Sequence, residues 1–126
     1  MSEPKKILVG EDSSVIINLT KNVLAFENYK MTAARNGKQV LELMEKEDFD
    51  LILMDINMPV LDGIECTKTI RAMKDERKSK IPIIAISGNI HNYTVDEFRK
   101  AGFDEFIQKP LDFDKVLSTV KKHLSL

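Results

Sequence analysis

The 126-residue sequence has one cysteine, no tryptophan and almost no net charge. Because Cys66 has no second cysteine to pair with, an internal disulfide and a cysteine-rich zinc site are both excluded. The 19 Lys and Arg residues nearly cancel the 20 Asp and Glu residues, which leaves a net charge of −1. General nucleic-acid binding requires a cationic surplus, so we expect no direct contact with nucleic acid.

The sequence also lacks any apolar run approaching the about 20 residues that span a bilayer. The first apolar run, Ile7-Leu8-Val9, is too short for the core of a signal peptide. Hydrophobic residues make up 43% of the chain, enough for a real core, and this content with the small net charge excludes disorder. We therefore expect one domain over residues 1–126, located in the cytoplasm and without a membrane partner.

Short apolar runs rich in β-branched residues alternate with longer segments of helical period. We predict strands at residues 6–10, 30–34, 50–54, 82–87 and 105–108. The first, third and fourth of these are apolar at nearly every position, which is typical of strands buried on both faces. We predict helices at residues 13–27, 37–47, 63–74, 94–101 and 112–124.

Five successive strand–helix units predict an α/β fold with an open parallel sheet and helices on both faces. Thr94 and Glu97 have the spacing of a capping box at the start of the fourth helix, and Gly102 suits a left-handed C-cap at its end. We interpret the charged run at residues 74–80 as a solvated loop. His91 and His123 are expected at the surface, and Cys66 is expected to pack as a small apolar residue.

Polar residues stand at the ends of the predicted strands. Glu11 and Asp12 follow the first strand, Asp55 and Ser87 end the third and fourth, and Lys109 follows the fifth. In open parallel sheets ligands bind beyond the carboxyl ends of the strands. We therefore expect these five side chains to share one site at that edge.

The charges of this site predict a divalent metal. Glu11, Asp12 and Asp55 carry three negative charges, and Lys109 returns one positive charge. A divalent cation would balance the remainder, whereas carboxylates left close together raise one another's pKa. Hard carboxylate oxygens favour Mg²⁺, with Mn²⁺ as a second possibility, over zinc or copper.

A metal, an ammonium group and a hydroxyl group together can neutralise a phosphoryl group during its transfer. Asp55, at the end of a strand, can attack phosphorus and form an acyl phosphate. No glycine-rich phosphate-binding loop follows the first strand, where the sequence is GEDSS at residues 10–14. The phosphoryl group is therefore expected from another protein or a small phosphodonor.

The segment LILMDINMPVLDG at residues 51–63 resembles the phosphoacceptor motif of response-regulator receiver domains, the acceptors of bacterial two-component signalling. The resemblance extends over essentially the whole chain. It includes the acidic pair after the first strand, Ser87-Gly88, Ala101-Gly102 and Lys109-Pro110. It implies a flavodoxin-like (βα)5 fold with the strand order 2-1-3-4-5.

By this resemblance Asp55 is the phosphorylated residue. The resemblance also implies a magnesium site formed by Asp12, Asp55 and the backbone carbonyl of Asn57, with Glu11 acting on the metal directly or through water. Asn57 and Asn89 flank the acceptor and are expected to tune the rate at which the phosphoryl group is lost.

The same resemblance assigns contacts and a switch around the phosphoryl group. Lys109 contacts a phosphoryl oxygen, and the hydroxyl of Ser87 turns toward the group once it is bound. Phe106, three residues before Lys109, occupies the aromatic switch position and moves inward as Ser87 moves. The Lys109–Pro110 bond is a candidate cis peptide.

The sequence departs modestly from the commonest family pattern. Glu11 stands where many members have Asp, and the extra methylene changes the reach toward a metal. Ser87 replaces a common Thr but keeps the hydroxyl, and Phe106 replaces a frequent Tyr and loses its hydroxyl. Taken singly, these residues have ordinary interpretations: helix-dipole compensation for the acidic pair, a surface side chain for Lys109 and core packing for Phe106.

The resemblance implies a non-enzymatic phosphoacceptor switch whose donor is a sensor histidine kinase or a histidine phosphotransfer protein. Slow self-catalysed phosphorylation and dephosphorylation are expected.

Two alternatives stay open: a phosphate-independent binding module of the same fold, and a small phosphatase with an Asp nucleophile. A phosphatase would need a general acid two residues after the nucleophile, where Asn57 stands. The kinase, the downstream target and whether the domain works alone or within a hybrid kinase stay open.

Overall fold

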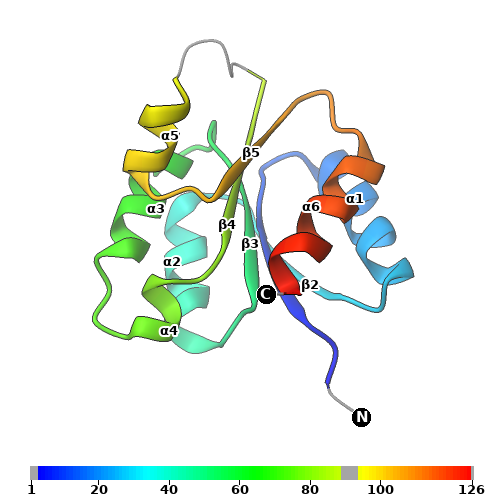
Figure 1. The fold of residues 1–126 in the computed structure, drawn as a ribbon, viewed down its shortest axis with the longest axis horizontal. Coiled ribbons are helices and arrows are strands. Elements are labelled where there is room, and N and C mark those ends of the chain that lie inside the picture. Colours follow the sequence, from blue (N-terminus) through cyan, green and yellow to red (C-terminus); the bar gives the residue numbers. More distant parts are fainter. Residues whose placement is uncertain (1–2, 89–93, 126) are drawn as a thin grey trace.

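The computed structural model describes residues 3–88 and 94–125, and within them the strands form one five-stranded parallel sheet. Its order is β2-β1-β3-β4-β5, so the predicted fold class and strand order are confirmed (Figure 1). The strands are β1 (Lys6–Gly10), β2 (Lys30–Ala34), β3 (Leu51–Asp55), β4 (Ile83–Ser87) and β5 (Glu105–Gln108).

Helices cover both faces of the sheet (Figure 1). They are α1 (Ser14–Phe26), α2 (Gly37–Lys46), α3 (Gly63–Arg71), α4 (Glu76–Ser79), α5 (Val95–Ala101) and α6 (Phe113–Leu124). Helices α1 and α6 lie against one face, whereas α2, α3 and α5 lie against the other. No helix in the two described ranges is long and apolar enough to cross a bilayer.

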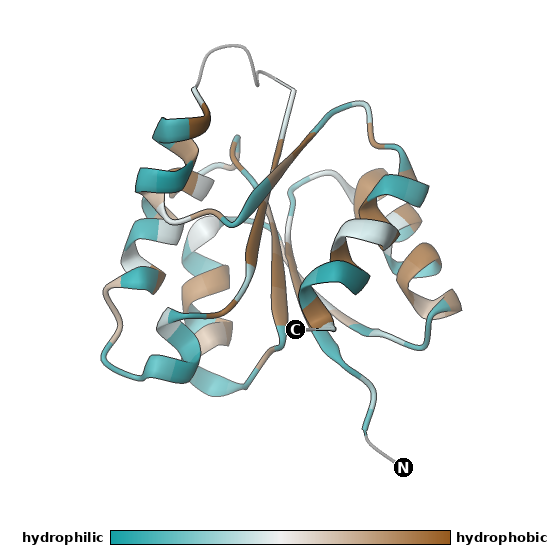
Figure 2. Cartoon of the chain, in the orientation of Figure 1, coloured by the Kyte–Doolittle hydropathy of each residue, from teal (hydrophilic) through white to brown (hydrophobic). Residues whose placement is uncertain are grey.

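The sheet is the centre of two hydrophobic cores, one beneath each helical layer. All five residues of β3 and all five of β4 are buried, as their continuous apolar sequences predict (Figure 2). One core joins Leu8 and Ile52 to residues of α2, α3 and α5, and the other joins Ile7 and Leu53 to residues of α1 and α6. The two central strands therefore form a rigid frame whose carboxyl ends present the polar residues described below.

Side chains cap the N-termini of the helices, and the capping box predicted for the helix at residues 94–101 is present. Ser13 caps α1 by accepting a hydrogen bond from Ile16, and Thr94 and Glu97 form the predicted capping box of α5. Gly102 ends α5 with a φ of 111°, a left-handed backbone conformation that residues with a Cβ rarely adopt.

Three expectations about this fold were wrong. Helix α3 ends at Arg71 rather than at residue 74, and the charged run contains the one-turn helix α4 instead of only a loop. The carboxylate of Asp75 accepts a hydrogen bond from the backbone of Arg77 and begins α4, which has no buried residue. His123 was expected at the surface but is partly buried, with 13% of its side chain exposed. His91, the other histidine expected at the surface, lies outside the described residues. Cys66, by contrast, is fully buried, and burial raises the pKa of its thiol to about 12.

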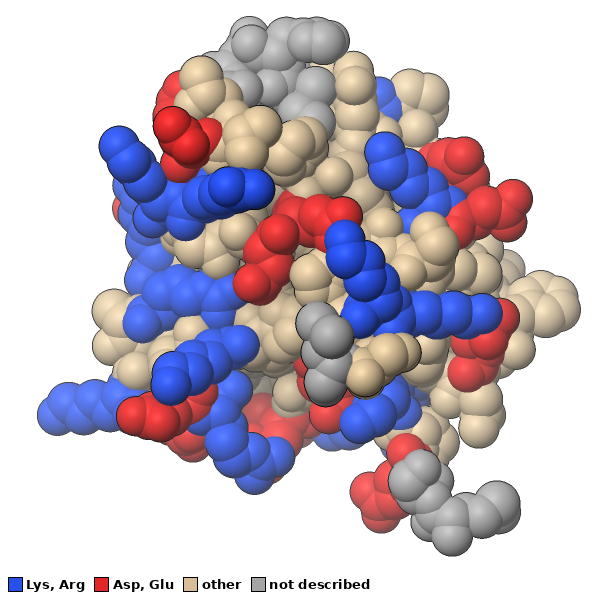
Figure 3. All heavy atoms as spheres, viewed as in Figure 1, with Lys and Arg blue, Asp and Glu red and all other residues tan. Residues whose placement is uncertain are grey.

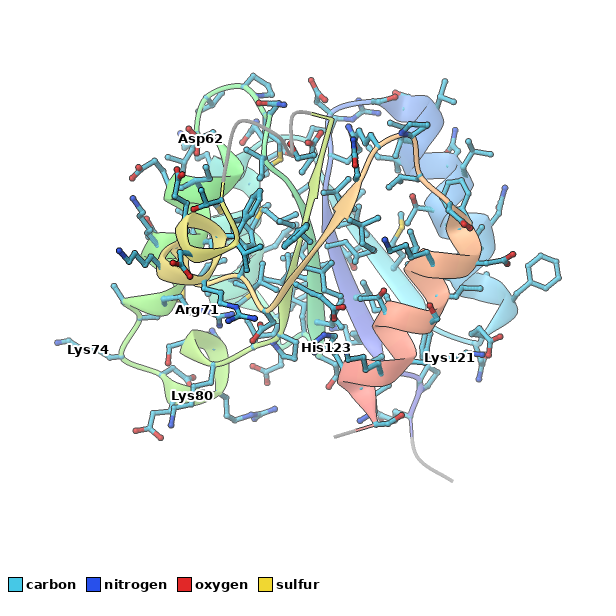
Figure 4. The ribbon with its side chains drawn as sticks, turned by 45° about the horizontal axis from the view of Figure 1, so that its top comes forward. Asp62, Arg71, Lys74, Lys80, Lys121 and His123 are labelled. Carbon is cyan, nitrogen blue, oxygen red and sulfur yellow. The ribbon has the colours of Figure 1, made fainter. Side chains whose placement is uncertain are left out.

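Arg71, at the C-terminal end of α3, forms hydrogen bonds and an ion pair with later segments of the chain. Its guanidinium donates hydrogen bonds to the carbonyls of Ser79, Ile81 and Gly102 at 2.8, 2.6 and 2.8 Å. It also forms an ion pair with Asp104 at 3.0 Å. Figure 4 shows Arg71 between the helical layer and the loop that leads into β5. Because a planar guanidinium can donate to several carbonyls at once, this one side chain fixes the positions of α4, the C-terminal end of α5 and the start of β5.

Glu105 on β5 contacts two side chains at the C-terminal end of α6. Its carboxylate lies 2.5 Å from Nε2 of His123 and 3.3 Å from Nζ of Lys122. Burial would raise the pKa of Glu105, but the hydrogen bonds from His123 and Lys122 outweigh this effect and lower its pKa below the ordinary value of 4.5.

Replacing this carboxylate should make stability less dependent on pH. A carboxyl group with a lowered pKa in the folded state stabilises the protein above its unfolded pKa, and this contribution is lost as pH falls through the folded value. Glu105→Gln should therefore lower the free energy of unfolding at pH 6, with the difference from the original chain shrinking below pH 4.5. Urea unfolding across this pH range measures the effect. The exposed Glu42→Gln serves as a control, and a constant difference for Glu105→Gln at every pH would contradict the prediction.

Candidate functional site

Three carboxylates meet at the carboxyl edge of the sheet. One carboxylate oxygen each from Glu11, Asp12 and Asp55 can be chosen so that the three atoms lie within 4.8 Å of one another. Glu11 and Asp55 are buried, with 2% and 3% of their surface exposed, whereas Asp12 is exposed. The parallel arrangement of β1 and β3 produces this cluster from residues that are more than forty positions apart.

Glu11 is held by both backbone and side-chain contacts. Its carboxylate accepts a hydrogen bond from the backbone N–H of Ser13 at 3.1 Å and lies 3.3 Å from Nζ of Lys109. Burial raises the pKa of Glu11, the hydrogen bond from Ser13 and the Lys109 charge lower it, and the nearby Asp55 raises it further. The net effect is a raised pKa, and burial of the carboxyl group is its main cause.

Lys109 places its ammonium group between two buried carboxylates. Its Nζ donates a hydrogen bond to Asp55 at 3.1 Å and lies 3.3 Å from Glu11. Burial by itself would lower the pKa of Lys109, but the contacts with Asp55 and Glu11 outweigh it and raise the pKa above the ordinary value. The ammonium is therefore charged at neutral pH. The Lys109–Pro110 peptide bond is cis, the geometry that the resemblance implied.

The loop after β3 fixes the carboxylate of Asp55. The backbone N–H of Asn57 donates to Asp55 at 3.2 Å, and the N–H of Gly63 donates to the carbonyl of Ile56 at 2.9 Å. A Cβ at position 63 would lie 2.4 Å from the backbone oxygen of Asp55, so only glycine lets α3 begin this close to the strand.

Ser87 and Phe106 lie on neighbouring strands beside this cluster. Ser87 is fully buried at the end of β4, and its carbonyl accepts a hydrogen bond from the backbone of Lys109 at 2.9 Å. Phe106 on β5 is half-buried and stacks on Phe98 of α5, with ring centroids 5.0 Å apart and an interplanar angle of 21°. The predicted rate-tuning residue Asn89 lies outside the described residues.

Two features of the site were missed in the sequence. Arg35 donates hydrogen bonds to the carbonyl of Asp12 at 3.2 Å and to the hydroxyl of Ser14 at 2.7 Å, so a second cation borders the acidic loop. Because Arg35 follows β2, the rule of strand ends could have identified it. Val60 has a φ of 71° in the acceptor loop, a strained value for a β-branched residue, and no sequence signal marks it.

The donor set fits a hard divalent cation. The three clustered carboxylates supply oxygen ligands only, and their charge exceeds that of the Lys109 ammonium. Mg²⁺ is bound in proteins by one or two carboxylates with water completing an octahedron, and the exposed Asp12 leaves this edge open to water. These three side chains are therefore the candidate metal ligands, and one of them, Asp55, also accepts a hydrogen bond from Lys109.

The sequence matches known proteins over most of its length. Residues 7–121 match the family model described as response regulator receiver domain. The polar-differentiation response regulator DivK of Brucella anthropi is 30% identical over 121 residues, covering 96% of this chain and 97% of DivK. The hybrid signal transduction histidine kinase M of Dictyostelium discoideum is 38% identical over 119 residues, covering 92% of this chain but only 5% of the kinase. The chain thus spans nearly all of one relative and a small part of another.

Solved structures share the fold of this chain. The receiver domain of a sensor histidine kinase from Pseudomonas aeruginosa aligns with a TM-score of 0.87 and 28% identity, covering 98% of this chain and 99% of that domain. That structure holds a magnesium ion coordinated in its active site cleft. A chemotaxis response regulator of Vibrio cholerae aligns with a TM-score of 0.87 and 26% identity, covering 96% of this chain and 99% of that protein.

Magnesium should stabilise the folded chain through the acidic cluster. A ligand that binds only the folded state at a concentration 100 times its Kd adds about 2.7 kcal/mol. Asp12→Asn removes a hard oxygen donor and one negative charge from an exposed position, so it should abolish most of the gain without disturbing the core. Thermal unfolding with Mg²⁺ and with chelator measures the shift.

The matched control for this experiment is Glu42→Gln, which removes an exposed carboxylate on α2 outside the cluster. It should respond to Mg²⁺ like the original chain. An equal response of Asp12→Asn would contradict the assignment of the metal to this cluster.

Proposed function

This chain belongs to the response regulator receiver family, the phosphoacceptor switches of two-component signalling, and we propose on that premise that Asp55 is the residue phosphorylated. The observation that supports this assignment is the buried Asp55 carboxylate, which lies in hydrogen-bond contact with Lys109 and within the acidic cluster. No other described carboxylate combines these two contacts with a place at the end of a central strand.

The proposed reaction transfers a phosphoryl group from phosphohistidine of a partner. A carboxylate oxygen of Asp55 attacks phosphorus, the new P–O bond forms, and the P–N bond to the imidazole breaks. The imidazole leaves with the electron pair and takes a proton from water. Lys109 remains protonated throughout, and its ammonium exchanges part of its contact with Asp55 for a phosphoryl oxygen.

Glu11, Asp12 and the Asp55 carboxylate are the proposed ligands of Mg²⁺, together with the backbone carbonyl of Asn57. Mn²⁺ has similar ligand preferences and is a second candidate. When bound there, the metal would neutralise charge on the phosphoryl oxygens. Three clustered carboxylates against the one ammonium of Lys109 support a site that is short of positive charge.

We propose that Ser87 and Phe106 convert phosphorylation into a change of shape. The hydroxyl of Ser87 turns to the phosphoryl group, and Phe106 on the neighbouring strand moves into the space released. The phosphoryl group would thereby shift a pre-existing equilibrium toward an active state of the face formed by α5, β5 and α6. The stacking of Phe106 on Phe98 supports a link between β5 and α5.

Loss of the phosphoryl group is proposed to be slow and self-catalysed, by attack of water on phosphorus at the edge of the site. Asn57 and Asn89 are the proposed tuning residues, since side chains beside the acceptor control the approach of water. Asn57 is exposed and its backbone contacts Asp55 directly, which supports this role.

The phosphodonor is proposed to be a sensor histidine kinase or a histidine phosphotransfer protein that docks over the N-terminal part of α1 in the cytoplasm. A hollow of about 220 Å³ has Ile16, Leu19 and Leu111 in its lining, together with Lys109, whose ammonium contacts Asp55. Val15 on the same helix is 68% exposed. An apolar surface next to Lys109 suits a partner that must bring its histidine into the site.

Intact-mass spectrometry tests the proposed acceptor. We expect incubation with acetyl phosphate and Mg²⁺ to add one phosphoryl group, and both chelator and Asp55→Asn to abolish the gain. Asp62→Asn is the matched control, because it changes a carboxylate in the same loop while asparagine can still cap α3.

A folded chain that gains no mass under any of these conditions would overturn the proposal and favour a phosphate-independent binding module. A gain that survives in Asp55→Asn would also overturn it. Rapid multiple turnover on phosphate esters would indicate a phosphatase instead.

A further inference from the structure

A groove lies between α3 and α5, on the side of the sheet opposite α1 and α6. Its volume is about 380 Å³, and it is lined by Ile64, Lys68, Glu97, Phe98, Lys100 and Ala101. Phe98 and Ala101 are buried and form an apolar floor, whereas Lys68 and Lys100 are exposed. The groove therefore combines an apolar floor with a cationic rim.

A second hollow of about 330 Å³ is lined by residues of α3, α4, α5 and the segment before β5, and its lining includes the cations Arg71, Lys80 and Arg99. Figure 3 shows Lys and Arg side chains gathered over this side of the molecule, where Figure 1 places α3, α4 and α5. Figure 4 shows Arg71 and Lys80 on the same side as the groove.

The acidic side chains along this surface are already engaged within the chain. Glu97 accepts a hydrogen bond from the backbone of Thr94, and Asp104 forms an ion pair with Arg71 and accepts a hydrogen bond from the backbone of Ile83. The two hollows together have five cationic and two acidic side chains in their linings.

Two of the cations are also paired, because Lys68 and Lys80 each lie 3.7 Å from a carboxylate, that of Glu65 and that of Glu76. Among the described residues Arg99 and Lys100 form no ion pair, so the positive charge presented outward is concentrated on α5, although the whole chain has a net charge of −1.

The chemistry of the groove favours an acidic helix over other anions. A bare phosphate or a nucleic-acid backbone would leave the apolar floor at Phe98 and Ala101 uncovered. Arg71, the least exposed cation here, directs most of its donors to backbone carbonyls and not into a ligand site. An amphipathic helix would place apolar side chains on the floor and carboxylates beside Lys68 and Lys100.

The floor of the groove is in contact with the proposed switch. Phe98 stacks on Phe106 and meets Phe103 edge to face, with ring centroids 5.9 Å apart in the second pair. A displacement of Phe106 would remove one side of the packing of Phe98 and so change the floor. This coupling rests on the proposed function, whereas the presence of the groove does not.

We propose that the seam between α3 and α5 is a docking groove for an acidic amphipathic helix of a partner protein, and that its affinity depends on the state of the acceptor through the Phe98–Phe106 contact.

The test uses a fluorescein-labelled peptide with Leu on one helical face and Glu on the other. Fluorescence anisotropy measures its Kd, and amide chemical shifts of the full chain locate its binding site. We expect the largest shifts in α3 and α5. The double variant Lys68→Glu/Lys100→Glu should weaken binding by about tenfold, since two attractive contacts become repulsive.

The control variant is Lys38→Glu/Lys115→Glu, which makes the same change of charge at exposed residues outside the groove. It should change the Kd by less than about twofold. The absence of saturable binding, equal weakening by both double variants, or shifts centred on α6 would overturn the docking site. Displacement of the peptide by a single-stranded oligonucleotide would overturn the choice of occupant.

A second arm repeats the titration after acetyl phosphate treatment, with intact mass recorded on each sample. We expect the Kd to differ by at least about threefold between phosphorylated and untreated chain, and Asp55→Asn to show no such difference. An unchanged Kd in chain that has gained a phosphoryl group would overturn the coupling. Failure to gain mass would instead count against the proposed acceptor. The anisotropy and chemical-shift measurements on the untreated chain would still show whether the peptide binds in the groove.

Discussion

The ammonium of Lys109, held between the carboxylates of Glu11 and Asp55, is the interaction on which the site depends. Both carboxylates are almost fully buried, and burying a charge is costly unless an opposite charge lies close by. Lys109 offsets part of that cost, at 3.3 Å from Glu11 and 3.1 Å from Asp55, but its single positive charge cannot balance the three carboxylates of the cluster. The same imbalance of charge makes this edge of the sheet suited to a divalent cation.

The strands that carry the charge cluster are tightly packed, whereas the contact between β5 and α5 leaves room for a change of side-chain packing. Strands β3 and β4 are buried throughout, and Gly63 lets α3 begin against the last residue of β3. Arg71 holds the C-terminal end of α5 to its neighbours, so movement in this helix is expected toward its N-terminal end. The half-buried Phe106 lies between the fixed sheet and α5 and is the natural place for a change of packing.

Apolar patterns and helix caps predicted most of the fold, and the rule of strand ends predicted which charged side chains lie together at the edge of the sheet. Continuous apolar runs identified the buried strands, and the spacing of Thr94 and Glu97 identified the start of α5. What could not be predicted depends on contacts between distant segments: the contact of His123 with Glu105, the stacking of Phe106 on Phe98 and the groove above it. Helix α4 was missed because a single turn begun by one capping side chain has no apolar periodicity to detect.

The central claim is that Asp55, and no neighbouring carboxylate, receives the phosphoryl group. Borohydride reduces an aspartyl phosphate to homoserine, so reduction followed by peptide sequencing marks the acceptor permanently. We expect homoserine at position 55 alone, with unmodified aspartate at positions 12 and 62. Homoserine at either of those positions, or a phosphoryl group retained on a histidine, would contradict the assignment and require a different role for the pair formed by Asp55 and Lys109.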